Sequence, residues 1–138
     1  MRMANLNESM TLFKQAASSG CKEAYSELAK KYFYGLGTEP SVQKAVEQLE
    51  AKGMTRSNAY VELAKISNNI YFTGLHSWLL TEALRSDSKN INAWKMLVDE
   101  VEAFDIYTDR DYGLKVLGKA CDVAAGEFCR RYKQLKRQ

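Results

Sequence analysis

The residues of this chain best suited to chemistry are its three cysteines and its single histidine. Cys21 stands alone, Cys121 and Cys129 are eight positions apart, and His76 is distant from all three in sequence. A cysteine nucleophile needs a neighbouring base, and a structural zinc site needs four closely spaced cysteine or histidine ligands. The sequence has neither pattern, so we expect no catalytic residue, no metal site and no cofactor.

Three states are open to Cys121 and Cys129: buried thiols, a disulfide, or a pair that includes a reactive thiol. Helix ends that cross near Ala125 and Gly126 can bring the two Cα atoms within bonding range. The first residues lack the apolar run of a signal peptide, and thiols stay reduced in the cytosol. We therefore expect reduced, buried thiols in preference to a disulfide, in a cytoplasmic protein. If a leader has been removed, a secreted or periplasmic location is expected instead.

The elements that must position these residues are helices. The chain of 138 residues is 46% hydrophobic and 27% charged, which is typical of one soluble globular domain spanning residues 1–138. No run of 18 apolar residues occurs, so a membrane is not an expected partner. Pro40 is the only proline, and strand-like runs bounded by turn pairs are absent. The composition predicts an all-α fold.

A repeat of about 35 residues organises the chain. The segment AYSELAKKYFYGLG begins at Ala24, AYVELAK begins at Ala59, and the weaker copy AWKMLVD begins at Ala93. A period of this length, with two helices in each copy, is the sequence mark of an α-solenoid. No single hairpin can bury its apolar stripe alone, so each must stack on the next. We predict an α/α superhelix of about four antiparallel hairpins.

Apolar spacing and helix-ending residues predict eight helices. The expected helices cover residues 7–18, 22–34, 42–52, a segment from about 57 to about 70, 75–85, 90–104, 109–123, and the last residues after Gly126. The fourth helix is expected to be about one turn longer than the second. The distance between the YFYGLG and YFTGLH segments exceeds the distance between the helix starts by four residues.

The run A-x-x-x-L-A-x-x-Y-x-x-G-x-G-T-x-P-x-x-x-K-A resembles the Sel-one-like repeat, a relative of the tetratricopeptide repeat. Its matching residues are Ala24, Leu28, Ala29, Tyr32, Gly35, Gly37, Lys44 and Ala45. Residues 113–129 resemble the cysteine-rich variety, in which a cysteine pairs with another eight positions later, here Cys121 with Cys129. The second copy departs at His76, which replaces a loop glycine, and the third lacks the Gly-x-Gly loop.

The resemblance implies a non-enzymatic adaptor that holds a peptide or protein on its concave face. Tyr25, Tyr60 and Trp94 each follow the alanine that begins a copy, and stacked repeats would align them. They are either core residues between repeats, the preferred interpretation, or an aromatic strip that anchors a partner. On the second interpretation the fourth helix adds Asn68, Asn69 and Tyr71 to the site.

Two alternative functions come from other classes. A hydrolase is possible because enzymatic activities are suggested for cysteine-rich relatives; it would need a deep pocket with converging polar groups. A weak nucleic-acid binder is the other, since the last nine residues, RRYKQLKRQ, carry five cations and no acid. The net charge of +3 leaves the rest of the chain at −2, and we prefer to see the tail as a solvated capping face. A nucleic acid is therefore not the expected partner.

An acidic stretch contains Asp105, Asp109 and Asp111 around Arg110. It could dock a basic peptide or a cation. We prefer the interpretation that Asp109 caps the helix that follows and that the acids complement its dipole.

Overall fold

The structure is a computed structural model that describes residues 3–67, 73–104 and 110–137. Within these ranges the chain is helical, with no strand, which confirms the all-α fold expected from the sequence. The helices are α1 Met3–Ser18, α2 Lys22–Tyr34, α3 Val42–Lys52, α4 Arg56–Ser67, α5 Thr73–Ser86, α6 Ile91–Phe104, α7 Arg110–Ala124 and α8 Glu127–Arg137.

The helices α2 and α3 begin and end where the sequence predicts, because the signals between them are strong. Gly35 is left-handed, with φ of 75°, and its N–H donates to the Lys31 carbonyl at 2.8 Å. A Cβ at Gly35 would lie 2.6 Å from Cγ of Pro40, so only glycine fits this turn. The hydroxyl of Ser41 accepts a hydrogen bond from the Lys44 N–H and caps α3.

Other boundaries differ from the expectation by a few residues. The helix α1 begins at Met3, four positions before the expected start, and α5 begins at Thr73. Asn90 precedes α6 as its cap, since its Oδ1 accepts a hydrogen bond from the Ala93 N–H at 3.3 Å. The predicted lengthening of α4 falls on residues 68–72, which lie outside the described part of the chain.

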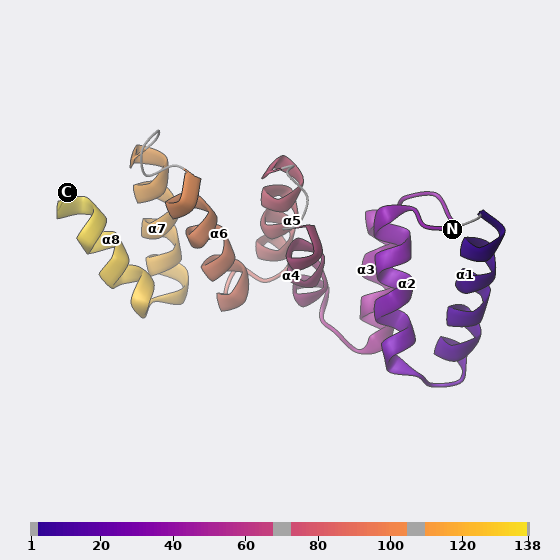
Figure 1. The fold of residues 1–138 in the computed structure, drawn as a ribbon. Helices are drawn as coiled ribbons and strands as arrows, with labels where there is room; N and C mark the ends of the chain where they lie inside the picture. Colours follow the sequence, from indigo (N-terminus) through magenta and orange to yellow (C-terminus); the bar gives the residue numbers. More distant parts are fainter. Residues whose placement is uncertain (1–2, 68–72, 105–109, 138) are drawn as a thin grey trace.

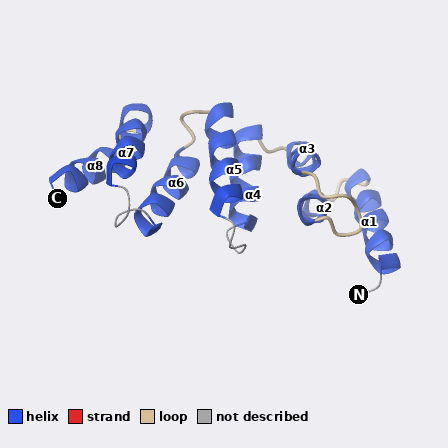
Figure 2. Cartoon of the chain, turned by 90° about the horizontal axis from the view of Figure 1, so that it is seen from above, coloured by secondary structure: helices blue, strands red, loops and turns tan. Residues whose placement is uncertain are grey.

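The helices follow one another in a row from α1 to α8, as Figure 1 shows. Substantial packing within the described part joins only helices that are neighbours in the chain, from α1 with α2 to α7 with α8. Seen from above, the row bends into an arc (Figure 2). In that view α2 lies nearer the inner side of the arc than α3, and α6 nearer than α7. This arrangement agrees with the predicted series of stacked hairpins.

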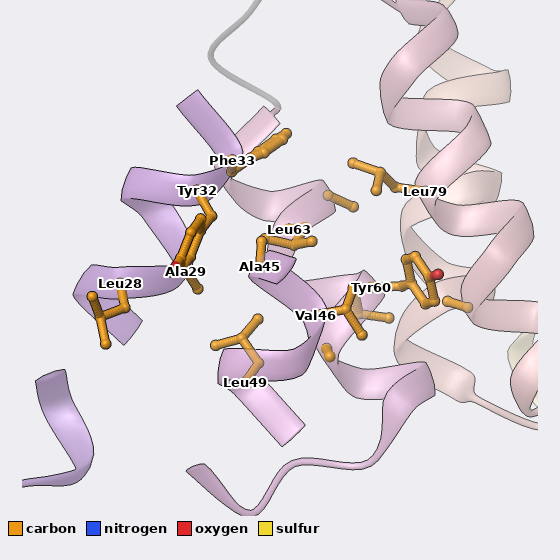
Figure 3. Packing of buried hydrophobic residues seen from close by; sticks show 14 of the residues in the cluster. Leu28, Ala29, Tyr32, Phe33, Ala45, Val46, Leu49, Tyr60, Leu63 and Leu79 are labelled. Carbon is orange, nitrogen blue, oxygen red and sulfur yellow. The ribbon is translucent and has the colours of Figure 1, made fainter. Parts of the chain in front are cut away.

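Two apolar clusters form the core. The first runs from α1 to the start of α6 and includes Leu28, Leu49, Leu63 and Leu79, all almost fully buried (Figure 3). The second joins α6, α7 and α8; its members are Trp94, Val98, Val116, Leu117, Ala120 and Phe128. Leu84 and Leu97 are partly buried and contact both clusters, so the core is continuous along the row.

Candidate interaction surface

One polar stripe recurs on the helices that open successive repeats. On α2 it consists of Glu23, Glu27, Lys30 and Tyr34, which share one face because they are spaced by four, three and four residues. Thirty-five positions later, α4 carries a matching stripe of Asn58, Glu62 and Lys65. These side chains are exposed or half-buried, so the two helices present equivalent groups to solvent.

The ion pairs of the stripe repeat as well. Lys30 lies 3.7 Å from Glu27 on α2, and Lys65 lies 3.8 Å from Glu62 on α4. Both pairs are about half exposed, so each contributes only a few tenths of a kcal/mol to stability. The recurring ion pairs are therefore a feature of the surface and contribute little to the stability of the fold.

The stripe continues on α6 and α8, which we group with α2 and α4 as the first helices. The equivalent polar residues are Asn92 and Asp99 on α6 and Glu127, Arg131 and Gln134 on α8; on α6 the position between them holds Met96, which is partly buried against the first cluster. Two contacts join these helices across the surface. Arg131 lies 3.2 Å from Asp99, and Lys95 lies 3.9 Å from Glu127. The stripes of α6 and α8 are therefore side by side.

Contacts of the same kind join the other first helices. The Tyr34 hydroxyl, on α2, donates to the carbonyl of Ile66 on α4 at 3.3 Å. Nδ2 of Asn90, the cap of α6, donates to Oδ1 of Asn58 on α4 at 3.0 Å. Successive first helices thus touch from α2 to α8 and form one polar surface, which we call the first-helix face.

The predicted aromatic strip is mostly core. Tyr60 and Trp94 are only 8% and 4% exposed. The Tyr60 ring meets Trp78 edge-on, with centroids 6.2 Å apart, and the Trp94 indole N–H donates to the Ser88 carbonyl at 2.7 Å. Tyr25 is half-buried against the first cluster. The packing alternative therefore describes Tyr60 and Trp94, which do not lie on an open surface.

The three rings also belong to different apolar clusters. Tyr25 and Tyr60 pack with the first cluster, whereas Trp94 belongs to the second. The remaining predicted site residues, Asn68, Asn69 and Tyr71, lie outside the described residues. The exposed stripe was missed because sequence reasoning followed the apolar positions; the 35-residue recurrence of Glu and Lys on the opposite face is the signal that finds it.

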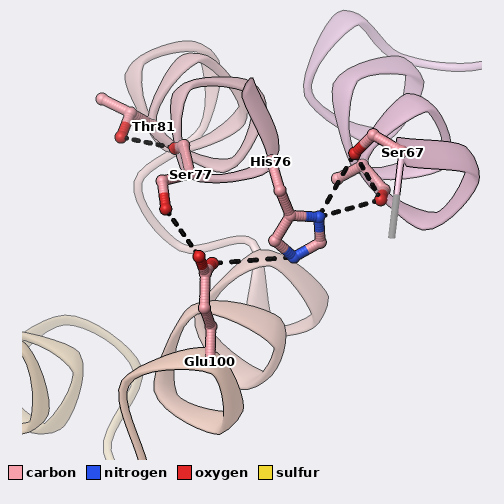
Figure 4. A network of polar contacts seen from close by, with 6 residues as sticks. Ser67, His76, Ser77, Thr81 and Glu100 are labelled. Carbon is pink, nitrogen blue, oxygen red and sulfur yellow. Dashed lines mark hydrogen bonds and ion pairs between the residues drawn. The ribbon is translucent and has the colours of Figure 1, made fainter. Parts of the chain in front are cut away.

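His76 is buried in a polar junction between hairpin α4–α5 and α6 (Figure 4). Its Nδ1 lies 3.0 Å from the Ala64 carbonyl and 3.3 Å from the Ser67 hydroxyl. Its Nε2 faces Oε2 of Glu100 at 3.6 Å, and Ser77 donates to the other oxygen of Glu100 at 2.8 Å. The junction therefore connects three helices through groups that water barely reaches.

The serine, histidine and glutamate of this junction do not have the geometry of a hydrolase site. A carbonyl can only accept, so the contact with Ala64 requires the proton to be on Nδ1 of His76. The buried Ser67 hydroxyl donates to the same carbonyl at 2.9 Å. His76 therefore presents no lone pair to the Ser67 proton, and the hydroxyl is not available to a substrate. His76 therefore acts as a structural residue that joins α4, α5 and α6.

Cys121 and Cys129 form a disulfide between α7 and α8, with their Cα atoms 4.6 Å apart. The preference for reduced thiols was wrong, and the pairing implied by the resemblance describes the structure. That preference rested on the assumed compartment, whereas helix ends crossing at Ala125 and Gly126 determine the distance. Cys21 is a free, exposed thiol in the N-cap position of α2.

Of the acidic stretch, only the Asp111 side chain is described; it is exposed in the first turn of α7. Asp105 and Asp109 lie outside the described residues, as does the predicted cap. Among the described side chains, no group of three His, Cys, Asp or Glu residues could hold a metal ion. No described helix is both long and apolar enough to cross a bilayer.

Comparison of the chain with protein-family models, with curated proteins and with solved structures gave no match.

Proposed function

We propose that this protein is a non-enzymatic interaction module that holds a peptide or another protein along its first-helix face. The observation that carries the proposal is the recurrence of equivalent exposed groups on helices that touch one another. A surface built from repeated units can be contacted at several points by one extended partner. The resemblance of residues 24–45 to the Sel-one-like repeat, although no family model matches the chain, implies the same function.

The partner of this face is expected to be polar. Its stripe contains the half-exposed ion pairs of Glu27 with Lys30 on α2 and of Glu62 with Lys65 on α4. Charged groups of both signs favour specificity and orientation more than raw affinity. We therefore expect binding that weakens with salt and that depends on charge order along the partner.

The test is affinity capture from the protein's own cells with the wild type and two charge-reversed variants. The first variant, Lys30→Glu with Lys65→Glu, changes two equivalent positions of the first-helix face. The second, Lys115→Glu with Lys119→Glu, makes the same change in net charge on exposed positions of α7. Circular dichroism should show unchanged helicity in both, because all four side chains are exposed.

The expected result is a protein captured by the wild type and by the α7 variant, and lost with the first-helix variant. If both variants lose the partner equally, the loss is due to the change in net charge and not to the first-helix face. Retention in both would place the partner elsewhere. The hydrolase alternative gains no support from the junction at His76, since Ser67 is buried there.

A further inference from the structure

The helix α8 has two opposite sides. Its inner side packs on α7 through Phe128, which is buried, and through Cys129, which is in the disulfide. On the outer side, Arg130, Lys133 and Arg137 are exposed and follow the spacing i, i+3, i+7. Residues at this spacing share one face of a helix, so these three side chains form a basic stripe directed away from the core.

The stripe is not neutralised by the rest of the structure. Within the described residues, none of its three side chains forms a hydrogen bond or an ion pair. Other cations of the surface do have carboxylate neighbours, as in the pairs of Lys30 with Glu27 and Lys65 with Glu62. The only acid of α8, Glu127, faces Lys95 on α6. Positive charge is therefore concentrated on one outward face.

Helix stabilisation does not explain the stripe. Cations near a helix C-terminus stabilise it by about 0.3–1 kcal/mol each through the macrodipole. That accounts for Arg137, in the last turn of α8. Arg130 lies in the first turn, where the dipole disfavours positive charge. A solvated outer face at the end of the repeat requires only a polar residue at that position, whereas a cation also suits a negatively charged ligand.

We propose that the basic stripe of Arg130, Lys133 and Arg137 binds the phosphodiester backbone of a nucleic acid without reading its sequence. Seven residues of helix span about 10 Å, at 1.5 Å per residue. Phosphates along one strand of a duplex advance by about 3.4 Å each, so the stripe can meet about three of them. Flexible cationic side chains with no base-reading partner give sequence-independent binding.

Two other polyanions fit the stripe less well. A membrane surface would be held better by a helix that inserts its apolar side, but that side of α8 is covered by α7. The first-helix face, proposed above for a protein partner, carries charges of both signs, whereas the stripe carries positive charge alone. A continuous line of phosphates needs only positive charge at regular intervals, which the stripe supplies.

The experiment measures binding of a short double-stranded DNA of mixed sequence by fluorescence anisotropy. Neutralising three phosphates gives a slope of log K against log salt of about −2.7, so raising salt from about 50 to about 200 mM should weaken binding about 40-fold. The variant Arg130→Gln, Lys133→Gln, Arg137→Gln should lose most binding at the lower salt. The matched variant Lys14→Gln, Arg56→Gln, Lys89→Gln, also of exposed cations, should keep it.

A conservative variant, Arg130→Lys with Arg137→Lys, keeps the charge and should keep the binding. It separates loss of charge from any disturbance of α8. Absence of DNA binding at about 50 mM salt would overturn the proposal. Equal losses in the two neutralised variants would do the same. Stronger stripe-dependent binding to poly-glutamate or to vesicles with acidic headgroups would assign the stripe to a different partner and also overturn it.

Discussion

The hairpins α1–α2 and α7–α8 occupy equivalent places in the repeat and are closed by different chemistry. In α1–α2, Ala17 is buried and Tyr25, eight positions later, is half-buried against the first cluster. At the corresponding positions of α7–α8, Cys121 and Cys129 form a disulfide. In both hairpins these two positions therefore lie in the core between helices, with apolar side chains at one end of the molecule and a covalent bond at the other.

The neighbouring position shows the same freedom. Ala24 and Phe128 precede Tyr25 and Cys129, and each is 2% exposed. The large and small side chains therefore change places between the two hairpins. On α2 the small Ala24 precedes the large Tyr25, whereas on α8 the large Phe128 precedes the small Cys129. The comparison teaches that the repeat determines which positions meet, while the total volume between the helices determines which residues fill them.

The largest effect is expected for Phe128→Ala, which gives α8 the residue that α2 has. Because Cys129 cannot supply the missing bulk, the change should leave a cavity and lower the free energy of unfolding by about 3–5 kcal/mol. Hydrogen exchange of α7 and α8 should accelerate, while α2 and α3, in the other cluster, keep their protection. An equal loss of protection in all four helices would show that the two clusters unfold together.

Removal of the disulfide by Cys121→Ser with Cys129→Ser is expected to cost about 2–3 kcal/mol, since the bond closes a short loop in the unfolded chain. Urea unfolding of the variant, and of the wild type under reducing conditions, should give the same midpoint. Cys21→Ala serves as the control and should change little, because Cys21 is exposed, forms no disulfide and makes no capping hydrogen bond to α2. A midpoint unaffected by the double substitution would mean that packing alone closes α7–α8.

The connecting glycines should be equally sensitive in the two hairpins. Gly20 and Gly126 have φ of 98° and 64°, and an added Cβ would meet no atom within 4 Å at either. Only the left-handed backbone then opposes alanine, so Gly20→Ala and Gly126→Ala should each cost about 1–2 kcal/mol in thermal or urea unfolding. A much smaller cost at Gly126 would indicate that the disulfide constrains the turn in the unfolded chain as well.

The smallest effect is expected at Ala125, which has φ of 56° and is the only non-glycine residue with positive φ in the described chain. Ala125→Gly should relieve left-handed strain, but it also adds freedom to the unfolded chain. The two effects nearly offset, and we expect a gain of about 0.5 kcal/mol in the same unfolding measurements. A loss of stability would show that Ala125 makes a favourable contact at this turn.

Local signals made much of the fold predictable. Gly35, Pro40 and Ser41 lie in one short connection, and the bounds of α2 and α3 followed from them. The periodic alanines at 24, 59 and 93 predicted the hairpin order, because small residues recur where helices meet. The early start of α1 at Met3 carried no comparable signal, since no cap or apolar period marks it.

The candidate site was harder to predict because it depends on which side of each helix is covered. Tyr60 and Trp94 have the composition of binding residues but are held in the core by neighbours on other helices. The contact between His76 and Glu100 joins residues 24 positions apart, and no local pattern reveals it. The sequence shows that the Glu and Lys residues of α2 recur on α4. Only the structure shows that the two helices touch, so that these residues form one surface.

Packing confined to chain neighbours has a consequence for how this molecule yields to force or heat. Apart from the polar contacts between successive first helices, each helix packs mainly on its neighbours in the chain, so removing an end helix leaves the packing of the others largely intact. When the two termini are pulled apart, the chain should therefore unfold in steps, one hairpin at a time. The short sequence distance between partners also favours rapid refolding, since little loop entropy opposes each step.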